Sequence, residues 1–205
     1  YYIGVNKIWL IVGGIFSALE PLAFLAMALF AVYMYRKGEK SHPNKIALFW
    51  TIGASIVSFV GAGLLGFAHT LPQTNLYTHG TLVTAMHGHY AFWGAYAMIV
   101  LAIISYALPN LTGRKRYNNT SGHMAFWLSN VGMLGMTVAF GVAGVAQVYL
   151  ERKMKLDFMD VQNEIAIHFV VLLLCATLFT TGITLFIIEF IKYGKPTDEA
   201  LVKEE

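Results

Sequence analysis

The sequence is poor in charged residues, in cysteine and in proline. Charged residues make up only 12% of its 205 residues, whereas ordinary soluble domains carry roughly 25%. The single cysteine, Cys175, excludes a disulfide within the chain, and in its apolar run a thiolate metal site is not expected. The net charge is only +3 and the basic residues lie in the connections, so we expect no nucleic-acid partner.

Long apolar runs are what the sequence has instead. Hydrophobic residues make up 57% of the chain, and the mean hydropathy is +0.60. A membrane-spanning helix needs about 20 apolar residues, and the chain has five such segments, at about 8–35, 46–68, 80–108, 124–150 and 165–193. We therefore predict an all-α, polytopic membrane helix bundle in contact with lipid. Residues 1–205 form one membrane domain, in which 194–205 are a polar tail.

Lysine and arginine are distributed unevenly between the two ends of these segments. Four lie at one end, and ten lie at the other, the end with the carboxyl terminus: Arg36, Lys37, Lys40, Lys45, Arg114, Lys115, Arg116, Lys192, Lys195 and Lys203. Basic residues are enriched in cytoplasmic connections. The amino end is therefore expected outside the cytoplasm and the carboxyl end inside it.

Three histidines lie together at the start of the third segment, in the stretch YTHGTLVTAMHGHYAFWGAY. On a helix, His87 and His89 point about 160° apart, and His79 lies about 80° from each. A lone buried histidine is usually satisfied by a hydrogen bond, but two that face opposite ways in hydrocarbon are costly unless each has a role. Neutral imidazole is a common axial ligand of haem iron. We predict one helix between two haems, with His87 and His89 about 10–15 Å below the helix start.

Glu20 is the second unusual residue, near the middle of the first segment in FSALEPLAF. A carboxylate at that depth is costly, so a functional role such as proton transfer is the first interpretation. The alternative is a structural acid that is hydrogen-bonded to a neighbouring helix, for example to a carbonyl group freed by Pro21.

Other polar residues have simpler interpretations. By themselves, His69 and Thr70 are polar groups at the end of the second segment. His168, near one end of the fifth segment, could meet a haem propionate, but a packed histidine at the interface is favoured. His42 and His123 are interpreted as capping or solvated groups.

A family resemblance rests on these residues. A histidine followed by histidines eight and ten positions later on one helix, here His79, His87 and His89, is the pattern of the tenth helix of the haem–copper oxidase superfamily. The sequence around these histidines most resembles the large catalytic subunit of cytochrome c-dependent nitric oxide reductases; it reads THGTLVTAMHGHYAFWGAYAMIVLAIISYALP. Glu20 in SALEPL and Thr70 favour that family over oxygen-reducing relatives. The resemblance covers the whole chain as the last five helices of a twelve-helix fold.

The resemblance implies a role for each residue. His87 would be the proximal ligand of a high-spin b-type haem, and His89 an axial ligand of a low-spin b-type haem. His79 would lie near haem propionates. Glu20 would shape the pocket of a non-haem iron and deliver protons, and Thr70 would support it by hydrogen bonding.

The implied reaction is the reduction of two nitric oxide molecules to nitrous oxide and water in denitrification, with two electrons and two protons. The protons would come from the outer side of the bacterial inner membrane, and none would be pumped. A cytochrome c-type small subunit would be a partner.

Several ligands of such a centre belong to upstream helices and are not in this sequence. They are the second axial ligand of the low-spin haem, and the three histidines and one glutamate of the non-haem iron. The chain opens on Tyr-Tyr-Ile-Gly, without an initiator methionine. We expect a carboxyl-terminal part whose missing ligands come from upstream helices of the same subunit or from a separate chain. The alternatives are part of an oxygen-reducing C-type oxidase, or a non-catalytic haem-binding or structural fragment.

Overall fold

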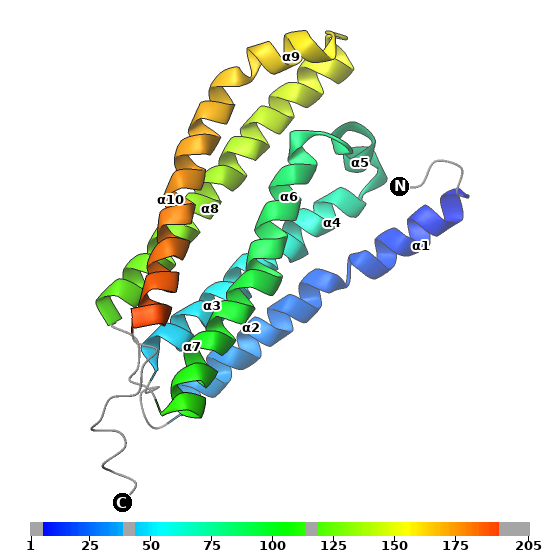
Figure 1. The fold of residues 1–205 in the computed structure, drawn as a ribbon. Helices are drawn as coiled ribbons and strands as arrows, with labels where there is room; N and C mark the ends of the chain where they lie inside the picture. Colours follow the sequence, from blue (N-terminus) through cyan, green and yellow to red (C-terminus); the bar gives the residue numbers. More distant parts are fainter. Residues whose placement is uncertain (1–5, 39–43, 114–118, 193–205) are drawn as a thin grey trace, which may run out of the picture.

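The computed structural model describes residues 6–38, 44–113 and 119–192 (Figure 1). Helices joined by short turns make up this part of the chain, and η marks the π-helical segments. In order, the elements are α1 (Lys7–Ser17), α2 (Glu20–Lys37), α3 (Lys45–Ser58), η1 (Phe59–Leu64), α4 (Leu65–Thr70), α5 (Pro72–Thr78), α6 (Leu82–Phe92), η2 (Trp93–Ala97), α7 (Met98–Thr112), α8 (Asn119–Val148), η3 (Tyr149–Lys153), α9 (Phe158–Glu164) and α10 (Ala166–Lys192).

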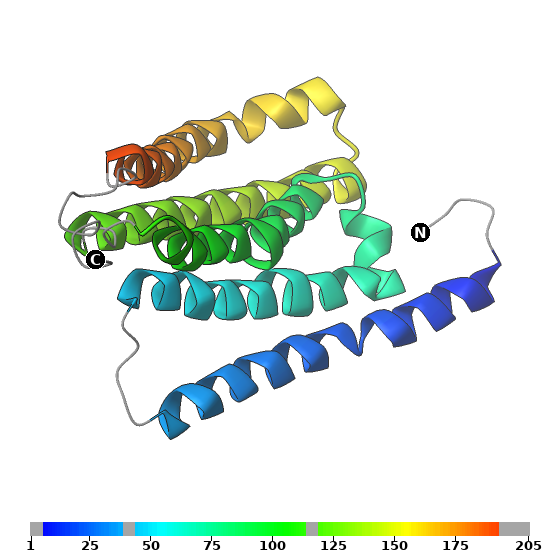
Figure 2. The same ribbon diagram turned by 60° about the horizontal axis from the view of Figure 1, so that its bottom comes forward.

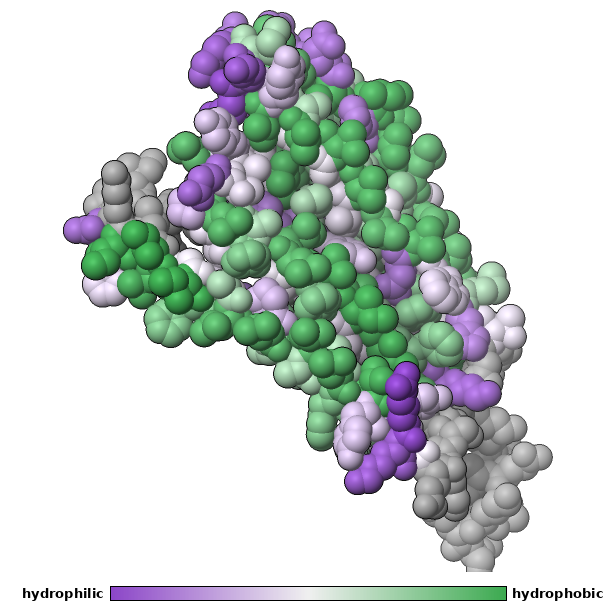
Figure 3. All heavy atoms as spheres, turned by 180° about the vertical axis from the view of Figure 1, so that it is seen from behind, coloured by the Kyte–Doolittle hydropathy of each residue, from purple (hydrophilic) through white to green (hydrophobic). Residues whose placement is uncertain are grey.

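The elements join into five rods that are long and apolar enough to cross a membrane. They cover Ile11–Lys37, Lys45–Thr70, Leu82–Leu111, Thr120–Lys153 and Ala166–Ile191, and we call them the first to fifth rods. Figure 3 shows apolar side chains over most of one face of the molecule, with hydrophilic side chains gathered most densely at its two ends. The predicted all-α, polytopic membrane helix bundle with five membrane helices is confirmed.

The rods lie side by side, and the third rod lies between the second and the fourth. Figures 1 and 2 show the first rod at one edge beside the second, and α10 at the opposite edge beside α8. The main contacts join α10 to α8, α6 to α8, and α3 to α7. The histidine-bearing helix α6 thus has protein on both sides.

The first rod, expected as one helix over residues 8–35, is broken in its middle. Pro21 has no N–H group to donate to the carbonyl group four residues earlier, that of Ser17. At the break, the Leu19 N–H donates to the Phe16 carbonyl oxygen over 3.1 Å, and α2 then begins at Glu20. The carboxylate is therefore carried on the first turn of a new helix, beside a break in the rod.

The second and third rods cross at very short range through glycines. A Cβ atom on Gly61 would lie 2.7 Å from the carbonyl carbon of Tyr90, and one on Gly94 would lie 2.5 Å from the Ser58 nitrogen. These glycines lie in the π-helical segments η1 and η2. Small residues permit such close approach of membrane helices, and the approach brings the backbone of η1 next to α6.

An aromatic core joins the second to fifth rods. The ring of Trp50, which has no exposed surface, meets Phe126 at 5.1 Å, Phe186 at 5.8 Å and Trp93 at 6.1 Å, in each case edge to face. The first rod takes no part in this core, and none of its most apolar window is buried among the described residues. It rests on the bundle mainly through contacts of α2 with η1 and α3, and of α1 with α4.

The fourth and fifth rods pack through Gly132 of α8. A Cβ atom at this position would lie 2.7 Å from the Phe179 Cα and 2.8 Å from the Cys175 carbonyl oxygen, both on α10. Because these are backbone atoms, they cannot move aside without separating the helices.

We expect Gly132→Ala to destabilise the bundle by about 1–3 kcal/mol, the usual cost of overpacking. Gly13→Ala is the matched control, because a Cβ there meets nothing within 4 Å and alanine is a better helix former than glycine. Thermal unfolding of the purified protein in detergent measures both. Equal midpoints for Gly132→Ala and the parent would show that α8 and α10 are not held this closely.

Candidate functional site

His87 and His89 of α6 line two different cavities. His87 is half-buried and His89 is exposed within the described part of the chain. Only one residue separates them, so their side chains leave the helix about 160° apart. The cavity that His87 lines lies between the first three rods, and the cavity that His89 lines lies among the third, fourth and fifth rods.

The first of these, which we call the glutamate cavity, brings Glu20, Thr70 and His87 together. Its volume is about 400 Å³. Glu20 comes from the broken first rod, Thr70 from the end of the second, and His87 from the third. Ser17, Phe24, Ala62, Gly66, His69, Ala91, Ala95 and Tyr96 complete its lining. Residues that are distant in the sequence thus form a single polar site among apolar helices.

The second, which we call the apolar cavity, has a volume of about 880 Å³. Apart from His89, it is lined almost entirely by apolar and aromatic side chains: Thr84, Ala85, Gly88, Phe92, Trp93, Tyr96, Ala97, Val100, Leu101, Met133, Phe179 and Ile183. The His89 ring also lies 4.8 Å from the ring of Phe140 on α8. Its volume and lining suit a large apolar molecule.

Backbone carbonyl groups determine which nitrogen of each imidazole carries the proton. His87 Nδ1 lies 2.9 Å from the Gly61 carbonyl oxygen, and His89 Nδ1 lies 2.8 Å from the Ala85 carbonyl oxygen. A carbonyl oxygen can only accept, so each Nδ1 must donate a hydrogen. Each ring in its neutral form therefore has an unprotonated Nε2 with a lone pair, which is the form that binds a metal.

These residues fit haem. Two imidazoles can serve as iron ligands through Nε2. The Nδ1 of each is held by a hydrogen bond to a carbonyl group, as is usual for histidines that bind metals. The apolar cavity supplies aromatic walls, among them Phe92 and Tyr96, whose rings stack at 5.5 Å. In the glutamate cavity a Cβ atom on Gly66 would lie 3.3 Å from His87 Cε1, so glycine leaves this ring its space.

Glu20 and Thr70 differ in their hydrogen bonds. The Thr70 hydroxyl donates to the Phe67 carbonyl oxygen over 2.7 Å, so its oxygen is left as an acceptor towards the cavity. Glu20 is exposed, and its carboxylate has no hydrogen bond to any other described residue. It can accept or, when protonated, donate a hydrogen bond in the cavity.

His79 lies apart from both cavities. It follows α5, its backbone N–H donates to the Asn75 carbonyl oxygen over 2.9 Å, and its side chain is exposed. It is not among the residues that line either cavity. The predicted proximity of His79 to haem propionates stays a prediction.

His69 is the residue of this site that sequence reasoning missed. It is 9% exposed, and its ring stacks on the ring of His87, with 5.1 Å between centroids and 25° between planes. Its Nδ1 donates to the Leu65 carbonyl oxygen over 2.8 Å. The sequence shows only a histidine at the end of an apolar segment, and no spacing rule links side chains on different helices.

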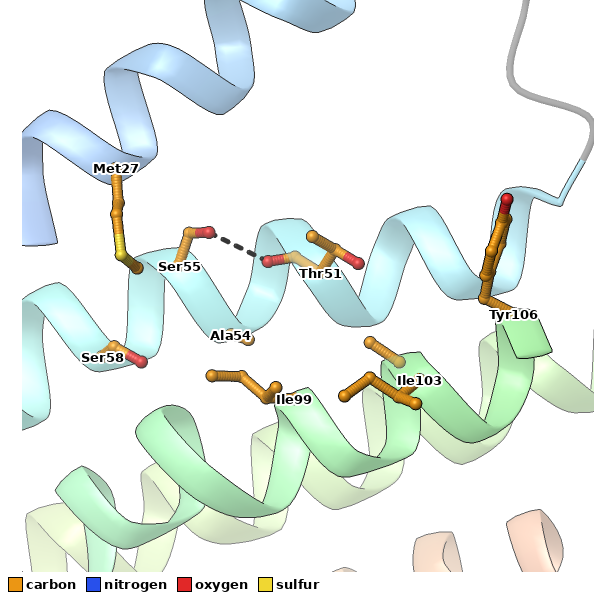
Figure 4. Close-up of a pocket in the computed structure, with 9 residues that line it drawn as sticks. Met27, Thr51, Ala54, Ser55, Ser58, Ile99, Ile103 and Tyr106 are labelled. Carbon is orange, nitrogen blue, oxygen red and sulfur yellow. Dashed lines mark hydrogen bonds between the residues drawn. The ribbon is translucent and has the colours of Figure 1, made fainter.

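A third cavity, of about 390 Å³, lies between α2, α3 and α7 (Figure 4). In this view the Met27 side chain points into the cavity from α2. The Ser55 hydroxyl donates a hydrogen bond to the Thr51 carbonyl oxygen over 3.0 Å. No carboxylate or histidine is among the residues that line it. We therefore assign it no chemistry. Within the described residues, no three metal-binding side chains of histidine, cysteine, aspartate or glutamate lie close enough to hold a metal ion.

Comparison with known proteins gives two findings. The sequence model of the family described as "Cytochrome C and Quinol oxidase polypeptide I" matches residues 1–178. The chain is also similar to a nitric oxide reductase subunit of Stutzerimonas stutzeri, with 41% identity over 203 residues. That match covers 95% of this chain and 43% of the relative, so the chain spans less than half of the relative's length.

Proposed function

Because the chain belongs to the cytochrome c and quinol oxidase polypeptide I family, the haem–copper oxidases, we propose that it is the haem-binding, carboxyl-terminal part of a nitric oxide reductase catalytic subunit. The reaction is the reduction of two nitric oxide molecules to nitrous oxide and water, with two electrons and two protons. One observation carries the proposal. Two imidazoles on one helix line separate cavities, and one of these cavities also holds a carboxylate.

His87 and His89 are the residues that would hold the two haems. His87 is assigned to the high-spin haem because its cavity also contains Glu20 and Thr70, the polar groups that a reaction consuming protons needs. His89 is assigned to the low-spin haem because its cavity is larger and apolar. When bound, the haems supply the one-electron chemistry. The helix holds both imidazoles in one rigid frame, with Gly88 alone between them.

We assign Glu20 and Thr70 to proton delivery. The Glu20 carboxylate oxygen can hold a proton within the glutamate cavity and release it there. Thr70 can accept a hydrogen bond from a protonated Glu20 or from water, because its own hydroxyl hydrogen is used by Phe67. Both residues line the cavity that also contains His87, so a proton held by Glu20 would be released beside the high-spin haem.

The remaining parts of the centre come from outside this chain. A non-haem iron would be completed by upstream helices of the same subunit or by a separate chain, which would also supply the second axial ligand of the low-spin haem. A cytochrome c-type small subunit would bring electrons. We place the assembly in the bacterial inner membrane, with the amino end periplasmic, the carboxyl end cytoplasmic and the α6 histidines in the outer half of the membrane.

An oxygen-reducing C-type oxidase is the second candidate, because the matching family model is described for cytochrome c and quinol oxidases. Haem, metal and product analysis of the purified membrane complex distinguishes nitric oxide reduction from oxygen reduction. Two b-type haems, non-haem iron and nitrous oxide formation support nitric oxide reduction. Copper with oxygen uptake supports the oxidase, and a complex without haem absorbance overturns both.

Glu20→Gln tests the carboxylate. The amide is isosteric but cannot give up a proton in the same way, so we expect nitric oxide turnover to fall on the order of 100-fold while both haems stay bound. Glu189→Gln is the matched control, because Glu189 is a buried carboxylate on the fifth rod that lines neither the glutamate cavity nor the apolar cavity. Unchanged turnover in Glu20→Gln would make Glu20 a structural residue.

A further inference from the structure

His69 and His87 form a stacked pair of imidazoles on two neighbouring rods. The centroids are 5.1 Å apart and the planes differ by 25°. His69 lies at the end of the second rod, and His87 lies in the middle of α6. Among the described residues, this is the only recorded stacking of two histidine rings.

The His69 ring is held independently of His87. Its Nδ1–H group donates over 2.8 Å to the Leu65 carbonyl oxygen, one turn earlier on the same helix. The residue is 9% exposed, so packing leaves its side chain little freedom to rotate. His69 therefore presents a fixed flat surface.

His87 is restrained from two directions. At its edge, Nδ1 donates to the Gly61 carbonyl oxygen over 2.9 Å, and at its face lies His69. The hydrogen bond alone still tolerates small rotations of the ring about its Cβ–Cγ bond. The stacked ring limits these rotations, because turning the imidazole out of its plane would drive it towards His69.

The burial of an unpaired nitrogen, on a ring that also stacks on His87, argues that His69 is more than a helix-end polar group. Its Nε2 is buried and has no hydrogen-bond partner among the described residues. A group that served only to end a helix would gain by turning that nitrogen to water, since an unpaired buried polar atom is costly. A histidine here gives what an apolar ring cannot, which is a flat face locked by its own Nδ1–H bond.

We propose that His69 is a positioning residue that fixes the plane of the His87 imidazole. The proposal rests on the proposed function, in which His87 holds the high-spin haem through Nε2. In this role His69 acts through the His87 ring and not directly on the haem or the substrate. It sets the rotation of the ligand ring about the bond that Nε2 would make.

The test is the iron–histidine stretching band of the high-spin haem in the reduced, fully assembled enzyme, recorded by resonance Raman spectroscopy. We expect this band to shift and broaden in His69→Leu, which removes the ring. In His69→Phe, which keeps a ring to stack on, we expect a band closer to that of the parent. The matched control is His123→Leu. His123 also has a buried unpaired Nε2 and a ring contact, 4.7 Å to Phe49, but it lies at the start of α8, away from both the glutamate cavity and the apolar cavity.

An unchanged band in His69→Leu with both haems bound would overturn the proposal. If His69→Leu fails to assemble, His69→Gln decides by the same criterion, and failure of both would make His69 a folding residue and also overturn it. A parent enzyme without any high-spin haem band would instead overturn the proposed function, so the two failures are distinguishable.

Discussion

Replacing His87 with alanine is expected to remove the high-spin haem from the purified assembly while the low-spin haem remains. The methyl group of alanine has no lone pair to bind iron, and the Gly61 carbonyl oxygen loses its donor at the same time. The apolar cavity around His89 is unaffected, because His87 is not among its lining residues. Haem content should fall from two to one, and nitric oxide reduction should fall to background.

Optical and electron paramagnetic resonance spectra of the oxidised enzyme measure the two haems separately. His123→Ala controls for the loss of a half-buried imidazole elsewhere in the bundle. Equal loss of both haems in His87→Ala would not support the assignment of one haem to each of His87 and His89, because a general folding defect has the same result.

The reverse pattern is expected for His89→Ala. Low-spin haem should be lost while the high-spin signal is kept, because the glutamate cavity does not include His89. Turnover with a cytochrome donor should also fall to background, since electrons would no longer reach the high-spin haem through the low-spin one. The His89 ring bonds to its own helix through the Ala85 carbonyl oxygen and makes a tilted ring contact with Phe140. Its removal should therefore disturb packing little.

Reduction of the purified His89→Ala variant with dithionite distinguishes a lost electron-transfer route from a lost high-spin haem. A small-molecule reductant can reach the high-spin haem directly, so a high-spin spectrum that still responds to dithionite would support the assigned order of electron transfer. Loss of the high-spin signal in His89→Ala would contradict the separate assignment of the two histidines.

The five rods could be predicted from the sequence because apolar length alone determines them. The separation of His87 from His89 could be predicted as well, since the winding of a helix determines the angle between residues two apart. In both cases the information is local.

The content of the glutamate cavity could not be predicted in that way. Only the family resemblance placed Glu20 and Thr70 near His87 before the structure did, and nothing placed His69 on its ring. These contacts depend on how three rods cross, and the crossing depends on glycines such as Gly61. Such glycines indicate a close approach of helices, but the sequence does not show that the partner of Gly61 is Tyr90. Pro21 did indicate a freed carbonyl group, but not that the rod would break there into two helices.

The hydrogen-bond acceptors for both ligand histidines are main-chain oxygens, and this protects the tautomers against the loss of a side chain. A side-chain acceptor can be deleted by one base change, whereas every residue type has a main-chain carbonyl group. At residue 61 this holds only for glycine in practice, because a Cβ atom there would meet the Tyr90 backbone at 2.7 Å. A change in chain length acts differently. Because Gly61 lies in a π-helical segment, an insertion or deletion within Phe59–Leu64 would rewind that turn and withdraw its carbonyl oxygen from His87. The hydrogen bond to His87 therefore depends on the length of this short segment as well as on the absence of a side chain at residue 61.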